Sequence, residues 1–273
     1  MTKNSKNKLD ANVYNKLLAW GENKQFEKIY IIGSSELIPD SCIGKSDSMT
    51  KTGNIYTRKS SGTFDTNELL NYTPEVERIY GDTRYEDVRY ETAIKIAKKM
   101  GNPTYLFFSN GQEYIDAYSI CAAACYLKSP LLLLPNDYSK DKTGEPYQTI
   151  TNYFEFLSSK NSVKKIFIAG GNQRNAHEVE IAVHEALKLT MPNSVERVAG
   201  QDRYDTSLSI AKEFNDFLSK PSEEIYSRAS LDNNQTNCSK IILIDGDDDT
   251  NDCPTVPVLA AKKLRCPIIV NSY

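Results

Sequence analysis

The chain has 273 residues, of which 40% are hydrophobic, so it can bury the core of one large domain or of two smaller ones. Its 33 Lys and Arg against 36 Asp and Glu give a formal net charge of −3, which argues against broad electrostatic binding to nucleic acid or to an anionic membrane. Residues 1–16 lack the apolar core of a signal peptide, and no stretch reaches the roughly 18 apolar residues of a membrane-spanning helix. We therefore expect neither export by such a signal nor insertion in a membrane.

The N-terminal part of the chain combines one helix–strand pair with a long polar segment. Residues 12–20 place apolar side chains at helical spacing, and residues 26–32 predict a strand that ends at Gly33. Residues 39–71 are rich in Ser, Thr, Lys and Gly and predict a long loop or arm. Such a segment is either a partner-binding element or a tolerated insertion.

One motif occurs twice in the chain. Residues 76–98 read VERIYGDTRYEDVRYETAIKIAK, and residues 195–212 read VERVAGQDRYDTSLSIAK. Both copies contain Val-Glu-Arg, an aliphatic residue, Gly, Arg-Tyr and then Ile-Ala-Lys within a run of helical spacing. The motif predicts a turn followed by a helix.

The start of each of these helices carries a capping pattern. Thr83-x-x-Glu86 in the first copy is a capping box, whose two side chains satisfy the first amides of the helix. Asp202-x-x-Asp205 is a similar arrangement in the second copy.

The remaining elements alternate between strand and helix. Strands are predicted at 105–108, 131–134, 163–169, 241–244 and 267–270, and helices at 115–127, 151–157, 176–189 and 255–264. Residues 219–239 are a second polar insertion. Because such alternation favours parallel sheets with helices on both faces, we predict an α/β fold of two repeated units with Rossmann-like layers.

The spacing of the repeat divides the chain into units. Residues 76–194 form a complete unit, and residues 39–75 form the polar arm. The segment 195–273 has counterparts of 105–108 and 130–134 at shifts of 136 to 137, and it stops before its third strand. We therefore predict a circularly permuted second unit of 195–273 plus 11–38, in which the strand at 29–32 joins the sheet of 241–244.

The repeat resembles the cell wall binding repeat 2 family of Gram-positive surface proteins. The matching residues are Arg197, Gly200, Asp202, Arg203, Tyr204, Thr206, Ile210 and Ala211, then Gly111 with Tyr114, Asp116 and Ala117, then 130–132, then 163–171. The resemblance implies a non-catalytic module, often present in sets of three, that binds an anionic secondary polymer of the cell wall.

Arginine side chains are the first candidates for such a ligand. Arg84, Arg89 and Arg203 can bind phosphate or carboxylate bidentately, or they can form structural ion pairs with a capping acid. Arg78 and Arg197 carry the same two alternatives. An apparent five-residue insertion leaves open whether Arg84 or Arg89 is the counterpart of Arg203. The full predicted ligand set is Arg84, Arg89, Arg203, Tyr204, Asp202, Asp116 and Asp252.

An acidic loop follows the strand at 241–244. Asp245, Asp247 and Asp249, with neighbouring Asp248, supply oxygen atoms of the kind that bind Ca²⁺, although the loop lacks the Gly and Glu of an EF-hand. A solvated loop is the alternative. We expect no cofactor, and the six cysteines, which lack zinc spacing, are expected to be reduced or to form one or more bridges.

The pattern leads to three hypotheses about function. The first is a binding module for a cell-wall polymer, and the second is a structural part of a phage virion, such as a capsid-decorating or tail component that contacts neighbouring subunits. Because residues 1–16 carry no signal peptide, a virion or release on lysis is favoured over the cell wall or cytoplasm as location. An enzyme is the third and is poorly supported, since no nucleophile signature is present. A homo-oligomer is a further expectation.

Overall fold

A computed structural model of the chain describes residues 28–36, 38, 57–58, 64–65, 75–81, 88–112, 115–136, 138, 145–172, 177–189, 194–219, 242–245 and 266–271. The chain divides into two compact units, Met1–Asp82 and Thr83–Tyr273, and each is described by itself. Among the described residues, no helix has the length and apolar character that crossing a membrane requires.

A four-stranded parallel sheet forms the centre of the second unit. Its order is β6-β5-β7-β8, and the strands are β5 (Tyr105–Asn110), β6 (Leu131–Leu134), β7 (Lys165–Ala169) and β8 (Val195–Val198). The first three are largely apolar runs, as expected for strands whose two faces are both covered.

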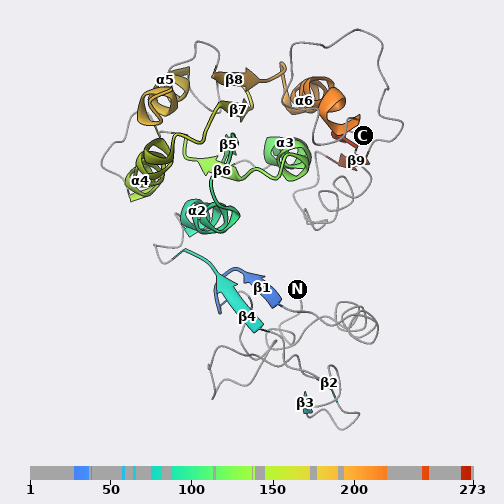
Figure 1. Cartoon of the computed structure of the whole chain (residues 1–273). Coiled ribbons are helices and arrows are strands. Elements are labelled where there is room, and N and C mark those ends of the chain that lie inside the picture. The colour runs from blue at the N-terminus through green and yellow to red at the C-terminus, as the bar shows by residue number, and fades with distance from the viewer. Residues whose placement is uncertain are drawn as a thin grey trace. The chain divides into compact units, whose positions relative to one another are not determined.

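Helices cover both faces of this sheet (Figure 1). The helices are α2 (Val88–Met100), α3 (Ile115–Tyr126), α4 (Glu145–Lys160), α5 (His177–Ala186) and α6 (Arg203–Ser219). Buried residues of α2, α4 and α5 share one core cluster with β5, β6 and β7, whereas those of α3 and α6 share another with β5, β7 and β8. The predicted α/β class, with parallel strands between helices, is confirmed.

Three aromatic rings hold the α3–α6 side of the core together. Phe107 on β5 stacks on Phe167 on β7 with ring centroids 5.2 Å apart. Phe214 on α6 lies 5.0 Å from Phe167 and 5.7 Å from Phe107. All three are almost fully buried, so α6 contributes directly to the core of the sheet that precedes it.

The helix α3 is apolar around most of its circumference because it has neighbours on two sides. Ile120 and Ala123 pack in the core of the four-stranded sheet, and Ala122 packs against Ile268 in a separate cluster. Ile268 belongs to a second parallel pair, β9 (Ile242–Asp245) with β10 (Ile268–Asn271). The small side chains of α3 allow this close approach on both sides.

The described residues of the first unit form two short sheets. β1 (Lys28–Ile32) pairs with β4 (Glu75–Ile79) in parallel, and β2 (Thr57–Arg58) pairs with β3 (Phe64–Asp65) in antiparallel. Within the predicted polar arm of 39–75, the described residues are those of β2, β3 and the first residue of β4, and the role of the arm stays a prediction. The predicted helices at 12–20 and 255–264 lie outside the described residues.

The Val-Glu-Arg motif forms a strand rather than the predicted turn. Val76 pairs with Ile29, and Val195 pairs with Ile166. Since 29 and 166 are 137 apart and 76 and 195 are 119 apart, the β1–β4 pair has the same register as the β7–β8 pair. The two shifts of the repeat are confirmed by strand pairing. The motif was taken for a turn because its charged residues alternate over only four positions.

The second parallel pair also repeats the first, with one correction to the alignment. The amide of Ile242 donates to the carbonyl of Pro267 at 3.0 Å, just as that of Phe107 donates to Pro130 at 3.1 Å. Ile242 is therefore the counterpart of Phe107, at a shift of 135 rather than the expected 136 to 137. β1 and β9 lie in separate two-stranded sheets, and completion of the second unit by residues 11–38 stays a prediction.

Replacing Phe214 with Ala tests the aromatic core. Loss of a buried ring that contacts two others should lower the free energy of unfolding by about 3–5 kcal/mol. Phe156→Ala is the matched control, since this ring is 43% exposed, and it should cost less than about 1 kcal/mol. Urea unfolding followed by circular dichroism measures both, and equal losses would contradict the assignment of the core.

Tyr153 should make the fold sensitive to alkali. Burial raises the pKa of Tyr153 from its ordinary 10.0 to about 12, and its hydroxyl is buried with no hydrogen-bond partner among the described residues. Because burial favours the neutral phenol, Tyr153 contributes to the free energy of unfolding as long as it is protonated. This contribution is complete below pH 10 and is lost as the pH rises from about 10 to 12. Tyr153→Phe should move the midpoint of base-induced unfolding to higher pH. Tyr30→Phe, at an exposed ring, should not.

Candidate functional site

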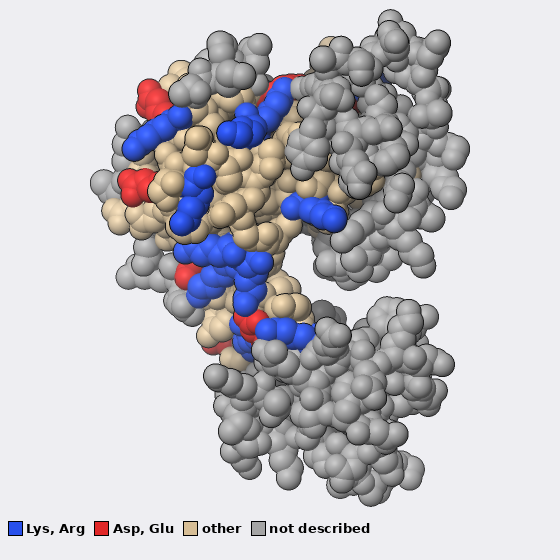
Figure 2. All heavy atoms as spheres, in the orientation of Figure 1, with Lys and Arg blue, Asp and Glu red and all other residues tan. Residues whose placement is uncertain are grey.

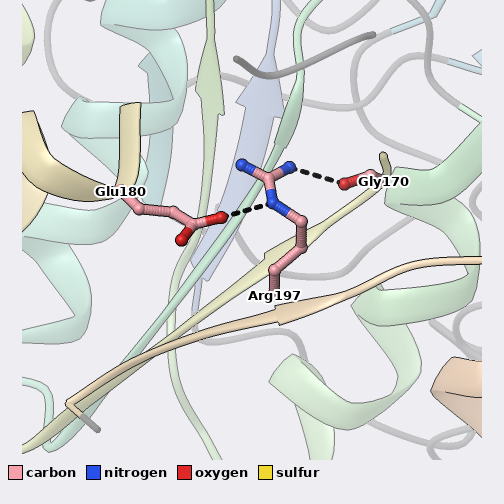
Figure 3. Close-up of polar contacts among 3 residues, drawn as sticks. All are labelled: Gly170, Glu180 and Arg197. Carbon is pink, nitrogen blue, oxygen red and sulfur yellow. Dashed lines mark hydrogen bonds and ion pairs between the residues drawn. The ribbon is translucent and has the colours of Figure 1, made fainter. Parts of the chain in front are cut away.

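Arg197 on β8 is held by one carboxylate and one backbone carbonyl (Figure 3). Its Nε donates to Oε1 of Glu180 on α5 at 2.5 Å, and its Nη1 donates to the carbonyl of Gly170 at 2.7 Å. The side chains of Arg197 and Glu180 are 13% and 22% exposed. Arg197 therefore links β8 to the end of β7 and to α5. These contacts fit a structural ion pair, which was one of the two alternatives for this residue.

Arg78 in the first unit also contacts the glycine that follows the neighbouring strand. Its Nη1 donates to the carbonyl of Gly33 and its Nη2 to the carbonyl of Ile38, both at 2.8 Å. Gly33 and Gly170 both adopt positive φ angles, of 128° and 98°, which favour glycine. Each also donates its amide to the paired strand. Each glycine thus forms a turn directly after its strand, β1 or β7.

Arg89 near the start of α2 also contacts a backbone carbonyl. Its Nη1 donates to the carbonyl of Gly111 at 2.6 Å. The neighbouring ring of Tyr90 is 4% exposed, and a Cβ on Gly111 would lie 2.3 Å from it. The pair Arg89-Tyr90 and Gly111 therefore fit together where β5 ends.

The register of the two repeat helices decides which arginine is the counterpart of Arg203. Arg203 precedes the buried Ala211 by eight residues on α6, and Arg89 precedes the buried Ala97 by eight residues on α2. Arg89 is therefore the helical counterpart of Arg203. Arg84 lies outside the described residues.

A group of amide side chains lies where β5 and β6 end. The Gln112 backbone amide donates to Asn110 Oδ1 at 2.7 Å, Asn110 Nδ2 donates to Asn136 Oδ1, and Asn136 Nδ2 donates to Gln112 Oε1 at 2.5 Å. The carboxyl edge of a parallel sheet is where ligands commonly bind in such folds. Sequence reasoning missed this group, and Asn110 directly before Gly111 was its one signal.

The start of α6 confirms the predicted cap. Oδ1 of Asp202 accepts hydrogen bonds from the amides of Tyr204 and Asp205, both at 2.8 Å. The amide of Gly200 donates to Oγ1 of Thr206 at 3.0 Å, and a Cβ on Gly200 would lie 2.3 Å from the backbone of Asp205. The Gly and Asp of the motif therefore shape the helix start, as does Thr206.

The other predicted ligand residues are dispersed. Arg203 is exposed at the first residue of α6, Asp116 is half-buried in the first turn of α3, and Asp245 ends β9 opposite Asn271. The residues Asp247, Asp248, Asp249 and Asp252 lie outside the described residues. Within the described ranges, no three His, Cys, Asp or Glu side chains gather as a metal site would require. The ligand and Ca²⁺ roles stay predictions.

The described cysteines are thiols. Cys121 and Cys125 face each other across one turn of α3 with their sulfur atoms 4.0 Å apart, and Cys266 is buried before β10. The hydrogen bond to Cys125 and burial both raise the pKa of the Cys121 thiol.

Basic side chains gather at α2. This helix carries four basic residues and one acidic residue, whereas its counterpart α6 carries two basic and three acidic residues. Arg89, Lys98 and Lys99 are exposed. Figure 2 shows a continuous group of Lys and Arg side chains at the place that α2 occupies in Figure 1. Because the total charge of the chain is nearly balanced, its composition does not reveal this local excess of basic residues.

Two curated relatives from Bacillus subtilis (strain 168) match about half of the chain. One is N-acetylmuramoyl-L-alanine amidase LytC, which is 28% identical over 142 residues that make up 50% of this chain and 24% of that protein. The other is an amidase enhancer, 28% identical over 130 residues, which are 47% of this chain and 16% of that protein. The chain thus spans less than a quarter of either relative.

Two solved structures share the fold of nearly the whole chain. Cwp6 from Clostridium difficile has a TM-score of 0.63 and 20% identity, covering 98% of this chain and 32% of that one. Cwp8 from Clostridium difficile has a TM-score of 0.52 and 19% identity, covering 97% and 44%. At these sequence identities, the similarity shows a shared fold alone.

The family match covers most of the complete repeat predicted at 76–194. It extends over residues 78–180, from Arg78 on β4 to Glu180 on α5, and the family is described as Cell wall binding domain 2 (CWB2). The family resemblance of the motifs is thereby confirmed. Over these residues the chain resembles the cell wall binding domain 2 family.

Proposed function

We propose that the chain is a non-catalytic module that binds an anionic polymer of a Gram-positive cell wall. The observation that carries this proposal is the match of residues 78–180 to the cell wall binding domain 2 family. The amidase activity in the name of LytC is a property of that protein, of which this chain spans 24%. The proposal assigns no catalytic group to this chain.

Arg78 and Arg197 contact other parts of the protein, so we place the polymer-binding surface on α2 instead. Arg78 and Arg197 contact backbone carbonyls of their own turns, and Arg197 is also neutralised by Glu180. Lys98 and Lys99 are exposed in the last turn of α2, within the group of basic side chains described above. A flexible ammonium group suits a repeating anionic polymer, since it binds phosphate or carboxylate without a fixed geometry.

Arg203 and Tyr204 remain a second proposed contact, with Asp202 holding the helix start beneath them. Arg203 is exposed, and the cap formed by Asp202 fixes its position at the first residue of α6. The alternative role in a phage particle stays a prediction without support from the relatives named above.

Charge reversal on α2 tests the binding surface. Lys98→Glu with Lys99→Glu should weaken binding to purified Gram-positive walls about tenfold, since each exposed ion contact contributes up to about 1 kcal/mol. Lys160→Glu with Lys164→Glu makes the same change of charge at exposed positions around the end of α4 and should bind like the parent chain. Sedimentation with walls measures both.

Two further outcomes bear on the function as a whole. Chemical removal of the anionic polymer should abolish sedimentation, and added salt should weaken it because exposed charges are screened. Arg203→Ala should weaken it if α6 contributes. Failure to bind walls of any Gram-positive species would exclude the proposal. Equal loss in the α2 and α4 variants would exclude α2 as the surface.

The variant Arg197→Met tests whether Arg197 has a structural role or binds the polymer. Removal of charge-assisted hydrogen bonds to Glu180 and Gly170 should lower the free energy of unfolding by about 1.5–3 kcal/mol. Wall binding of the folded protein should be unchanged, because Arg197 is directed to these partners. A stable variant that no longer binds walls would show instead that Arg197 contacts the polymer.

A further inference from the structure

Two arginines of the second unit hold a glycine carbonyl with the same atom. Nη1 of Arg197 donates to the carbonyl of Gly170 at 2.7 Å. Nη1 of Arg89 donates to the carbonyl of Gly111 at 2.6 Å. Each of these contacts leaves the opposite edge of the guanidinium, formed by Nε and Nη2, for another partner. Such an edge binds a carboxylate or a phosphate through two parallel hydrogen bonds.

The two arginines differ in what this second edge meets. Nε of Arg197 donates to Oε1 of Glu180, a carboxylate of the same protein, at 2.5 Å. Nε and Nη2 of Arg89 make no ion pair or hydrogen bond with any residue that the structure describes. Arg89 is also exposed. Its guanidinium is thus held at one atom and open at the edge that suits an external oxyanion, which lowers the cost of ordering it on binding.

Gly111 connects Arg89 to the amide side chains where β5 and β6 end. The amide of Gly111 donates to the carbonyl of Leu134 on β6 at 2.9 Å. The next residue along the chain is Gln112, and its Oε1 accepts a hydrogen bond from Nδ2 of Asn136 at 2.5 Å. Both amide side chains are exposed. They lie at the carboxyl edge of the parallel sheet, where ligands commonly bind in α/β folds.

Both exposed amides keep hydrogen-bonding groups for a ligand. A carboxamide has two donor hydrogens and two acceptor lone pairs. Among the described contacts, Nε2 of Gln112 donates to no acceptor, and Asn136 uses one of its two N–H groups. Asn110 is 1% exposed, accepts from the backbone amide of Gln112 at 2.7 Å and donates to Asn136. The remaining donors and acceptors are therefore held in place, as recognition of sugar hydroxyls requires.

We propose that Arg89, Gln112 and Asn136 form a subsite for one anionic sugar unit of the wall polymer. The carboxylate or phosphate of this unit binds the Nε–Nη2 edge of Arg89, and its hydroxyl groups bind the two amides. The subsite rests on the proposed function, since its ligand is a unit of the polymer assigned there. Lys98 and Lys99 then supply attraction to any polyanion, whereas the subsite selects a sugar.

Binding of single sugars to the full chain tests the subsite without walls. Glucose 6-phosphate and glucuronate carry the two kinds of anion, and glucose is the neutral control. In two-dimensional NMR spectra, at least one anionic sugar should shift the side-chain amide signals of Gln112 and Asn136, and glucose should shift them less. The anion that binds more tightly identifies the charged group of the unit. Absence of shifts with both anionic sugars would overturn the subsite.

The same titration tests the role of Arg89. Arg89→Gln should weaken binding of the anionic sugar about tenfold, because a charge-assisted pair of hydrogen bonds is lost. Lys164→Gln is the matched control, since it removes one positive charge at an exposed position before β7, and it should bind like the parent chain. Equal affinity of the Arg89→Gln variant and the parent chain would overturn the assignment.

Wall binding connects the subsite to the polymer. Gln112→Ala with Asn136→Ala leaves the net charge unchanged and should weaken sedimentation with walls about fivefold. Gln112→Glu, which keeps the shape of the side chain and opposes the anion, should weaken it further. Asn102→Ala with Asn152→Ala removes two exposed amides, before β5 and on α4, and should bind like the parent chain.

The outcomes separate the subsite from the proposed function. A parent chain that binds walls, together with subsite variants that bind equally well, would overturn the subsite and leave the proposed function intact. A parent chain that binds no walls would overturn the proposed function, and the assignment of the subsite to a wall polymer with it.

Discussion

The pairing of β8 with β7 is the interaction on which the rest of the second unit depends. β8 opens one repeat, yet it hydrogen-bonds to the last strand of the repeat before it, and Arg197 fixes that junction through Glu180 and Gly170. Because α6 follows β8 after a short capped turn, the pairing also determines where α6 lies. Phe214 then reaches the core between β5 and β7. The four-stranded sheet and its core therefore include β8 and α6, which belong to the next repeat in the sequence.

The helix α3 has a similar double role. Its small residues pack against the four-stranded sheet on one side and against β10 on the other. A helix with large side chains would hold the two sheets farther apart, whereas Ala122, Ala123 and Ala124 keep them close. Adjacent repeats are thus joined at two places, by the pairing of β7 with β8 and by the helix α3. Both junctions bury apolar surface.

Much of this fold could be predicted from the sequence, because apolar runs and helical spacing report burial directly. The strand at Leu131–Leu134 and the helix beginning at Ile115 lie where the pattern placed them. The strands β4 and β8 could not be recognised, since Val-Glu-Arg alternates over too few residues to differ from a turn. Of the candidate site, the Asp202 cap was predictable because it is local. The pairing of Arg197 with Glu180 was not, since it joins residues 17 positions apart on different elements.

The equal registers of β1–β4 and β7–β8 have a consequence for how this chain can be altered. The connection from Gly33 to Val76 is 43 positions long, and that from Gly170 to Val195 is 25, yet after each the next strand pairs with the preceding one in the same register. Closing the longer connection costs only about 0.5 kcal/mol more by loop entropy. Pairing and the arginine contacts, rather than the connecting segment, set the geometry. We therefore expect that peptide can be inserted between Ile38 and Glu75, or sequence removed there, while the β1–β4 pairing is kept.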